Sequence, residues 1–338
     1  MDNAPEEKAA TVKVFAQALG FDLVGIARPE PSGHCHAYRA WIAAGKHGEM
    51  NYLARNIDDR LDPEKNFPWA KSIVCVALAY HQEAVASGQE SAAGGQSEEA
   101  VGMPLGKIAR YAWGRDYHKV IEAKLKKLER RIRAAFAMPG EMLEVRAYAD
   151  TGPVLERELA ARAGLGWVGK NTLLIHPRQG SWFVLGELLL SLELAADAPV
   201  GDHCGTCRRC IEACPTAAIE PYSVDARKCV SYLTLEHRGI IAEPLHDQMR
   251  KAQFVAGCDI CQEVCPFNRK PLPCQEADFA PRPPAPAVGP REVLAWQEQE
   301  WDILTRGRAT RRAKFAMWKR NAGVLAGTLN FLPPPEPQ

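Results

Sequence analysis

Eight of the eleven cysteines in this 338-residue chain lie between residues 204 and 265, at spacings that suit iron–sulfur ligation. The stretch CGTCRRCIEACP follows the pattern C-x2-C-x2-C-x3-C-P, which bacterial ferredoxins use to bind a [4Fe–4S] cluster. Three thiolates on one tight loop can reach three irons of a cube, whereas the fourth, placed before a proline, points toward a second cluster. The pattern consists of Cys204, Cys207, Cys210 and Cys214.

A second run, GCDICQEVCP, repeats this pattern without its first cysteine, because Val255 stands in that place. Cys229 is available to complete the set, and eight thiolates then satisfy two cubes. One cluster takes Cys204, Cys207, Cys210 and Cys265, and the other takes Cys229, Cys258, Cys261 and Cys214. Zinc is the alternative, but its tetrahedral sites favour paired C-x2-C motifs, which three cysteines at this spacing fit poorly.

The other three cysteines have no such spacing. Cys75 stands inside the apolar run SIVCVALAY and is expected in the core. Cys35, between two histidines in GHCH, favours a polar loop over a small metal site. Cys274 has no partner at ligand spacing and is expected to be incidental.

Length and composition indicate an ordinary globular protein of about two domains. Hydrophobic residues make up 46% of the chain and charged residues 25%. The most apolar stretch, WFVLGELLLSLEL, is interrupted by Glu187 and Glu193, which argues against a membrane span. The N-terminus is acidic and polar, unlike a secretory signal, so we expect a cytoplasmic protein whose thiols stay reduced. No heptad seam is visible, and a monomer is expected.

Strand and helix patterns alternate from about residue 20 to 195, which predicts an α/β domain. Strands are expected at FDLVGIAR, SIVCVALAY, LEVRAYAD, NTLLIHP and WFVLGELLL, and a helix that opens at Pro153 is expected in TGPVLERELAARAG. Gln82–Ala100 reads as a mobile surface loop. The fold class is therefore α+β or α/β, with an N-terminal domain over 1–198, a two-cluster ferredoxin-like domain over 199–275, and a proline-rich connector with a short basic helical tail over 276–338.

The net charge of +1 does not by itself indicate a nucleic-acid partner. Two stretches are nevertheless basic, a long helix expected from Asp116 to about Phe136 and the segment Thr305–Arg320. A charge run is usually a solvated helix face. The first domain has neither G-x-G-x-x-G after a strand nor a P-loop, so a dinucleotide or nucleoside triphosphate is not indicated.

Five motifs together resemble the epoxyqueuosine reductase family: RYAWGRDYHKVI, DTGPVLERELAARAGLGWVGKNTLLIHPRQGSWFVLGELLL, CGTCRRCIEACPTAAI, CVSYLTLEHRG and GCDICQEVCPFNRK. The resemblance covers residues from about 10 to 325. It implies a cytoplasmic enzyme that depends on cobalamin and two [4Fe–4S] clusters, similar in architecture to reductive dehalogenases. The implied reaction converts epoxyqueuosine to queuosine at the wobble position of tRNA.

The resemblance also implies site residues. The family's catalytic aspartate, a proton donor to the epoxide oxygen, falls on Asp150; without the resemblance, Asp150 or Thr151 would simply cap the following helix. The cobalamin-binding signature D-x-H-x-x-G begins at Asp116 and His118 but fails at Ile121, so no histidine ligand to cobalt is expected. Contacts to the corrin are expected from Lys170, Asn171 and Thr172, and from Ser231, Tyr232, His237 and Arg238 beside the second cluster.

The implied partners are a tRNA anticodon loop, held by phosphate contacts from the two basic stretches with the modified base splayed out, and an external low-potential electron donor. Two other functions stay open at this point. One is a corrinoid iron–sulfur reductase that acts on a small organohalide or epoxide. The other is an electron-transfer protein that reactivates a partner's corrinoid, which would need no acid at Asp150.

Overall fold

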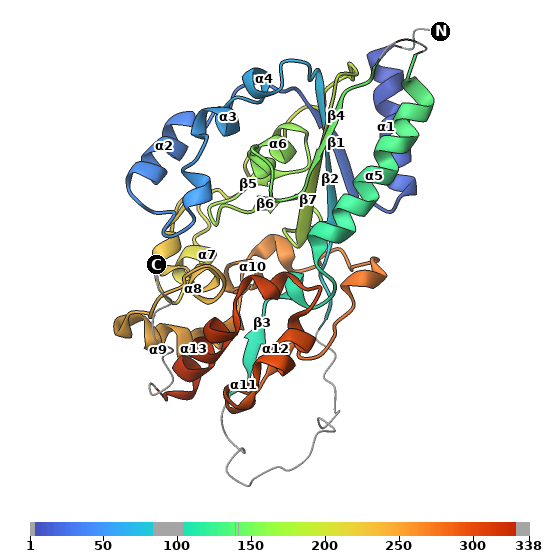
Figure 1. Ribbon diagram of the computed structural model, residues 1–338. Helices are drawn as coiled ribbons and strands as arrows, with labels where there is room; N and C mark the ends of the chain where they lie inside the picture. Colours follow the sequence, from blue (N-terminus) through green and yellow to red (C-terminus); the bar gives the residue numbers. More distant parts are fainter. Residues whose placement is uncertain (1–3, 84–103, 139, 141, 329–338) are drawn as a thin grey trace.

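The computed structural model describes residues 4–83, 104–138, 140 and 142–328 (Figure 1). Its first half is built on a four-stranded sheet in the order β1-β2-β7-β4. The strands are β1 (Leu23–Ala27), β2 (Ser72–Ala79), β7 (Phe183–Leu190) and β4 (Val145–Tyr148). Most of the expected loop Gln82–Ala100 lies outside the described residues.

Every neighbouring pair of strands in this sheet is antiparallel. The first half is therefore an α+β arrangement, and the expected α/β domain is wrong. Alternation of strands and helices along a chain does not determine strand direction. The path of the connecting segment decides whether the next strand runs parallel or antiparallel to the one before it. Within the described part of the chain, no helix is long and apolar enough to cross a bilayer.

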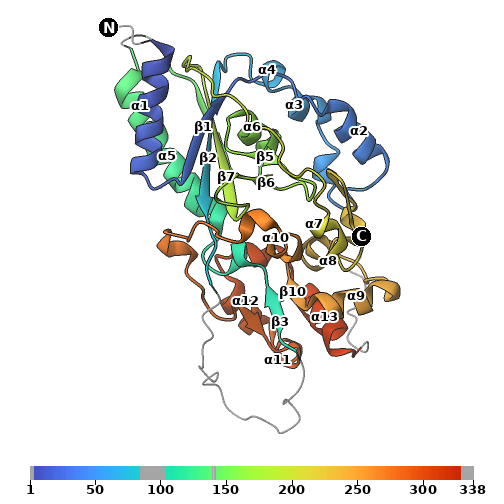
Figure 2. The same ribbon diagram turned by 180° about the vertical axis from the view of Figure 1, so that it is seen from behind.

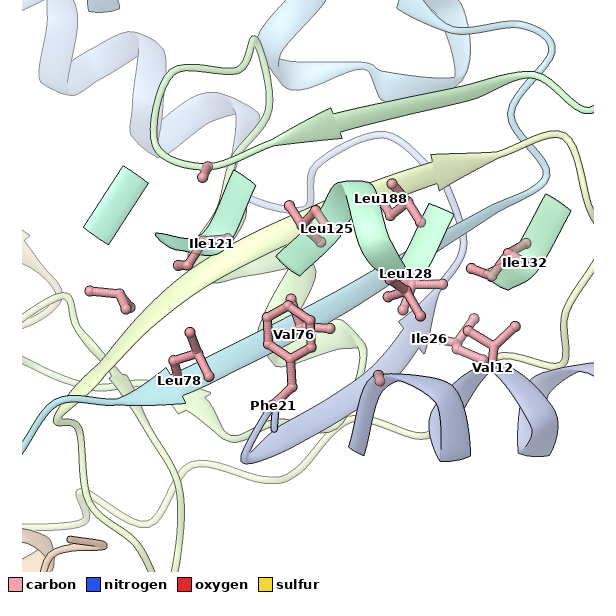
Figure 3. Close-up of a cluster of buried hydrophobic side chains, with 14 of the residues drawn as sticks. Val12, Phe21, Ile26, Val76, Leu78, Ile121, Leu125, Leu128, Ile132 and Leu188 are labelled. Atoms are coloured by element: carbon pink, nitrogen blue, oxygen red, sulfur yellow. The ribbon is translucent and has the colours of Figure 1, made fainter. Parts of the chain in front are cut away.

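Helices cover both faces of the sheet (Figures 1 and 2). On one face lie α1 (Pro5–Ala18) and α5 (Tyr117–Phe136), and on the other lies α6 (Glu156–Arg162). Figure 3 shows the core on the first face, where Val76, Leu78 and Leu188 of the sheet meet side chains of the two helices. Gly186 permits this approach, because a Cβ there would lie 2.6 Å from Ile121 Cγ2.

Helix α5 confirms the expected long basic helix and positions a site residue. Its apolar stripe is buried against the sheet, and burial of each large side chain stabilises the fold by about 1.5–3 kcal/mol. Asp116 caps the helix by accepting a hydrogen bond from the His118 amide, at 3.1 Å. The stripe consists of Val120, Ile121, Leu125, Leu128 and Ile132.

Helix α6 begins at Glu156, three residues later than expected from Pro153. Its N-cap residue is Leu155, which provides no side-chain hydrogen bond, so neither Asp150 nor Thr151 caps the helix. Residues 149–155 form a loop instead. Cys75 lies in the core between α6 and the sheet, as predicted.

Short helices follow β1 and lead to β2. They are α2 (Cys35–Ala43), α3 (Ile57–Leu61) and α4 (Pro63–Asn66), with the 3-10 turn η1 (Asn51–Leu53). The expected loop at Cys35 is wrong, because this residue opens α2. Its Sγ donates to the Ser32 carbonyl oxygen at 2.9 Å, so the thiol has a local structural partner.

The second half of the molecule consists of short elements. Its helices are α7 (Arg209–Glu212), α8 (Val230–Leu235), α9 (His246–Ala252), α10 (Ile260–Glu263), α11 (Pro290–Ala295), α12 (Glu298–Thr305) and α13 (Phe315–Ala326). Its 3-10 turns are η3 (Arg110–Ala112), η4 (Ala226–Lys228), η5 (Glu243–Leu245), η6 (Pro266–Asn268), η7 (Ala277–Phe279) and η8 (Ala309–Arg312). Two small hairpins pair β5 (Trp167–Val168) with β6 (Leu174–Ile175) and β8 (Ile219–Glu220) with β9 (Ser223–Val224).

A three-stranded sheet takes one strand from each of the three expected segments. Its order is β10 (Phe254–Ala256), β3 (Gly106–Ile108) and β11 (Ala287–Val288). Around it, Trp113, Val255, Trp296 and Trp318 share one hydrophobic core. Residues 276–328 of the C-terminal segment are thus packed into the second half. The boundaries at 198 and 275 stay a prediction.

The basic segment Thr305–Arg320 is largely occupied with internal contacts. Arg308 and Arg320, only 8% and 4% exposed, donate to backbone carbonyl oxygens. Arg311 pairs with Asp302, and Arg312 pairs with Glu236. Most of these charges stabilise the fold, which weakens the expectation that this segment holds phosphates.

Candidate active site and cluster sites

Asp150 lies directly after β4, at the end of the strand as expected. Its φ is 65°, in the left-handed region that residues other than glycine rarely adopt. Its side chain is 60% exposed. Strained residues of this kind cluster at functional sites, since the surrounding structure must hold them in place.

The carboxylate of Asp150 faces two consecutive residues of α5. Nε2 of His118 lies 3.1 Å from Asp150 Oδ2, and Tyr117 lies close enough to this carboxylate to help lower its pKa. Nδ1 of the same imidazole lies 2.6 Å from Asp116 Oδ1. His118 therefore stands between two carboxylates, with both ring nitrogens in use.

These contacts decide where the proton resides. The hydrogen bond from His118 is the main cause that lowers the pKa of Asp150, and burial opposes it. Burial also disfavours the charged form of His118, but the hydrogen bonds to Asp116 and Asp150 outweigh it and raise the pKa of His118 to about 9. At neutral pH the imidazolium carries the proton and Asp150 is a carboxylate.

The thiols of the first expected cluster lie together in space. Burial is the main cause that raises the pKa of Cys265, and repulsion from the thiolates of Cys204, Cys210 and Cys207 adds to it. Trp167 Nε1 lies 3.5 Å from Cys204 Sγ, so an N–H donor faces this group. Such N–H···S contacts are one of the ways in which proteins tune cluster potentials.

The second expected group is also assembled. Burial raises the pKa of Cys258, and repulsion from Cys229 and Cys214 contributes further. Burial also raises the pKa of Cys261, and repulsion from Cys258 and Cys229, and from Cys210 of the first group, adds to it. Cys214 thus joins the thiols of the later motif, and Cys265 joins those of the earlier one. Among the described residues, no three His, Cys, Asp or Glu side chains are grouped so as to hold a single metal ion.

The segment 170–172 contacts the cluster loops. Lys170 Nζ donates to the carbonyl oxygens of Gly205 and of Cys207, the latter at 3.0 Å. Asn171 is buried, and its Nδ2 lies 3.4 Å from the Cys261 carbonyl oxygen. Thr172 has a φ of 65°, and its carbonyl oxygen accepts from Arg157. Lys170 and Asn171 therefore support the cluster loops, a role that was not expected for them.

The residues expected beside the second cluster bind Glu49, which follows α2. The Tyr232 hydroxyl accepts from the Glu49 amide at 2.7 Å, and His237 Nδ1 lies 2.8 Å from Glu49 Oε1. The Arg238 amide donates to Glu49 Oε2 at 2.8 Å, whereas Ser231 is half-buried at the start of α8. Three of the four are therefore engaged in holding the segment before η1.

Sequence reasoning missed His118 and Tyr117 as partners of Asp150. The signal was present in DYH at residues 116–118, which was set aside because the glycine of a cobalt-ligand motif is missing. Asp150 also acts electrostatically on Tyr52, Tyr111 and Arg312, which come from both halves of the molecule. The carboxylate therefore lies near the junction of the two halves.

Comparison with known proteins agrees with both parts of this site. Residues 60–151 match the family model "Epoxyqueuosine reductase QueG, DUF1730", and residues 203–268 match "4Fe-4S double cluster binding domain". The epoxyqueuosine reductase of Gloeobacter violaceus is 43% identical over 94% of this chain and 96% of its own length.

Two solved structures are similar over 94% of this chain and 80% of their own. One, an epoxyqueuosine reductase with an epoxyqueuosine-modified tRNA stem loop, has a TM-score of 0.80 at 26% identity. The other, the Bacillus subtilis enzyme with its catalytic aspartate loop swung out of the active site, has a TM-score of 0.78 at 26% identity.

Proposed function

Because the chain belongs to the epoxyqueuosine reductase family, we propose that it reduces epoxyqueuosine to queuosine at the wobble position of tRNA. The observation that carries this proposal is the pairing of Asp150 with a protonated His118, in a chain that also gathers eight cysteines into two groups of four. Asp150 is the residue to which we assign proton delivery.

The donor set fits two [4Fe–4S] clusters. Cys204, Cys207, Cys210 and Cys265 would hold one, and Cys214, Cys229, Cys258 and Cys261 would hold the other. The match of residues 203–268 to a double-cluster domain supports both.

Cobalamin, when bound, supplies the two-electron reduction of the epoxide and is itself re-reduced through the clusters. The chain has polar groups that could bind the amide side chains of cobalamin. Lys170 retains one of its three N–H donors after its two carbonyl contacts, and the hydroxyls of Thr172 and Ser231 are half-buried. His118 has both nitrogens engaged by carboxylates, which supports the expectation that it is not a ligand to cobalt.

Conversion of the epoxide to an alkene removes one oxygen, so the reaction consumes two electrons and two protons and releases water. The Asp116–His118–Asp150 array holds one of these protons beside the exposed Asp150 carboxylate, and solvent supplies the other. As charge develops on the departing oxygen, this proton can pass from the imidazolium to Asp150 and on to that oxygen. Asp116 compensates the imidazolium charge before transfer.

The tRNA would be held by the exposed cations of α5, since most cations of the segment Thr305–Arg320 have internal partners. The exposed residues are Lys119, Lys126, Lys127, Arg130 and Arg131.

Electrons would enter from an external low-potential donor. An open depression of about 540 Å³ lies beside Cys265 and is lined by Arg209, Arg269, Glu212 and Glu263, so a carrier protein that docks there would meet charges of both signs.

The test is an anaerobic single-turnover assay with reconstituted protein, cobalamin, a chemical reductant and tRNA that carries epoxyqueuosine. Nucleoside mass analysis should show the loss of one oxygen, and omission of cobalamin should abolish it. No conversion by protein with both clusters and cobalamin bound would overturn the proposal and favour a small-molecule reductase.

A further inference from the structure

A glutamate is buried in the central part of the main sheet, outside the array that moves the proton. Glu187 lies in β7 with 0% of its surface exposed, opposite Cys75 of β2 and Tyr148 of β4. Along β7, Leu189 shares its face of the sheet, which is the face covered by α6. Neither carboxyl oxygen of Glu187 has a geometric hydrogen-bond donor among the described residues. A buried carboxyl with no donor is costly, and such groups are almost always paired.

The partner of Glu187 is Glu156, the first residue of α6. The two carboxyl groups lie close enough to act on each other. Ionised carboxylates only accept hydrogen bonds, so a proton held between the two groups would give Glu187 the donor that it lacks. Burial is the main cause that raises the pKa of Glu156 to about 7, and it raises the pKa of Glu187 well above its ordinary value.

The other contact of Glu156 is with the catalytic loop. Its Oε1 accepts a hydrogen bond from the backbone N–H of Asp150, the residue with a φ of 65°. Arg60 supports the same loop by donating to the carbonyl oxygen of Gly152 at 3.0 Å. Gly152 is packed against the Tyr148 ring, where a Cβ would lie 2.5 Å from a ring carbon. The strained backbone of Asp150 is thus tied to the sheet through Glu156.

We propose that Glu156, anchored by Glu187, is a positioning residue that holds the Asp150 loop against His118, and that loss of this contact lets the loop leave the site. The inference rests on the proposed function, because the loop has a catalytic role only if Asp150 delivers the proton. That such a loop can move is known from the related Bacillus subtilis structure, in which it is swung out. In this chain, the Glu156–Asp150 hydrogen bond joins the loop to a buried group.

The direct test is amide hydrogen exchange of the peptide that contains Asp150, measured by mass spectrometry on the holoenzyme. Glu156→Ala removes the acceptor and should speed exchange of the Asp150 amide about ten- to a hundredfold, because a charge-assisted hydrogen bond is lost. Glu156→Gln keeps a carbonyl oxygen for that amide and an N–H₂ donor for Glu187, so its exchange should stay near that of the wild type.

Glu158→Ala is the matched control. Glu158 lies two residues along the same helix and is also buried, but it binds the Ser32 hydroxyl and the Gly33 amide. A general loosening of α6 would speed exchange at Asp150 in this variant as well, and that result would overturn the proposal.

Turnover provides a second readout. Glu156→Ala should lower kcat with little change in KM for tRNA, and Glu156→Gln should restore it. Unchanged exchange in folded Glu156→Ala, or faster exchange with an unchanged kcat, would contradict the positioning role. Hydrogen exchange needs no turnover, so a wild-type protein that fails to convert tRNA would sink the proposed function and still leave the contact measurable.

Discussion

His118 Nε2 lies 3.1 Å from Asp150 Oδ2, and this contact joins the first turn of α5 to the loop after β4. A helix whose apolar stripe is buried against the sheet thus presents an imidazolium to an exposed carboxylate. His118, on the rigid helix, carries the proton, and Asp150, on the loop, is the group that reaches the substrate.

Replacing Asp150 with asparagine removes the proton acceptor of the pair and keeps the size of the side chain. The single-turnover rate should fall by about 10²- to 10⁴-fold, the usual contribution of a positioned acid. Iron content and cobalamin binding should not change. Deoxygenation at the wild-type rate in this variant would return Asp150 to a structural role.

The His118→Gln variant should lose part of the pH dependence of the free energy of unfolding. The pKa of His118 is raised from 6.5 to about 9, so its stabilising contribution is full below pH 6.5 and is lost as the pH rises through 9. The wild-type free energy of unfolding should fall by about 1 to 3 kcal/mol across this range, and the turnover rate should fall above pH 9. Chemical denaturation at several pH values should show a flatter profile for the variant; identical profiles would argue against a protonated His118.

The Glu156–Glu187 pair predicts a second pH effect, which Glu187→Gln should isolate. The pKa of Glu156 is raised from 4.5 to about 7, so its stabilising contribution is full below pH 4.5 and is lost as the pH rises through 7. Glu187→Gln supplies a permanent N–H donor and should reduce the loss between pH 4.5 and 7 by about 1 to 3 kcal/mol.

The measurement is the free energy of unfolding of Glu187→Gln and of wild type at both pH values. The groups that face the pair are Asp150 of the loop, Cys75 of β2, Tyr117 of α5, Tyr148 of β4 and Arg157 of α6. In the double variant Glu187→Gln/His118→Gln, the two reductions in the pH dependence of the free energy of unfolding should add. A Glu187→Gln profile as steep as that of the wild type would mean that the pair does not share a proton.

Serine variants of single cysteines test the exchange of fourth ligands. Cys265→Ser should resemble Cys204→Ser in its electron paramagnetic resonance spectrum, and Cys214→Ser should resemble Cys258→Ser. Each change should remove up to about four irons per chain, the content of one cube. Cys274→Ser is the control, because Cys274 packs against the hydrophobic core between the four-stranded sheet, α1 and α5, and its Sγ faces the Glu276 carbonyl oxygen. If Cys265→Ser behaved like Cys261→Ser, each motif would fill its own cluster.

Charge reversal on α5 tests how tRNA is held. Lys126→Glu combined with Lys127→Glu should weaken tRNA binding about equally across tRNA sequences and reduce the salt dependence of the binding constant. Glu122, also exposed on α5, gives the control variant Glu122→Gln, which should not weaken binding. Electrophoretic mobility shifts at several salt concentrations provide the measurement, and an unchanged salt slope would exclude these two lysines.

Local patterns predicted much of the fold. The apolar run 72–80 is the buried strand β2, and the basic amphipathic pattern after Asp116 is α5. Cysteine spacing predicted two groups of four thiols, and the assignment of each cysteine to a cluster stays a prediction. Strand direction was not predictable in the same way, because it depends on the path of the segments that connect the strands.

The support of Asp150 depended on tertiary contacts. His118 reaches it from 32 residues earlier in the chain, and Glu156, six residues later, reaches back to its backbone from a different helix. Neither contact is marked by a spacing pattern in the sequence. Glu187 did leave a signal, because a charged residue interrupts the apolar run 182–190. That interruption was used only to argue against a membrane span, whereas a glutamate on a buried strand also calls for a partner.

The three-stranded sheet β10-β3-β11 has a consequence for how the enzyme is made. Its strands come from residues near 107, 255 and 287, and α13 near residue 320 closes the same core. Contacts this distant in sequence form slowly and only after the later segment exists. We therefore expect the cluster-binding half to fold after almost all of the chain has left the ribosome, so that iron is loaded into a finished polypeptide and a fragment that ends after Cys274 cannot serve as a stand-alone ferredoxin.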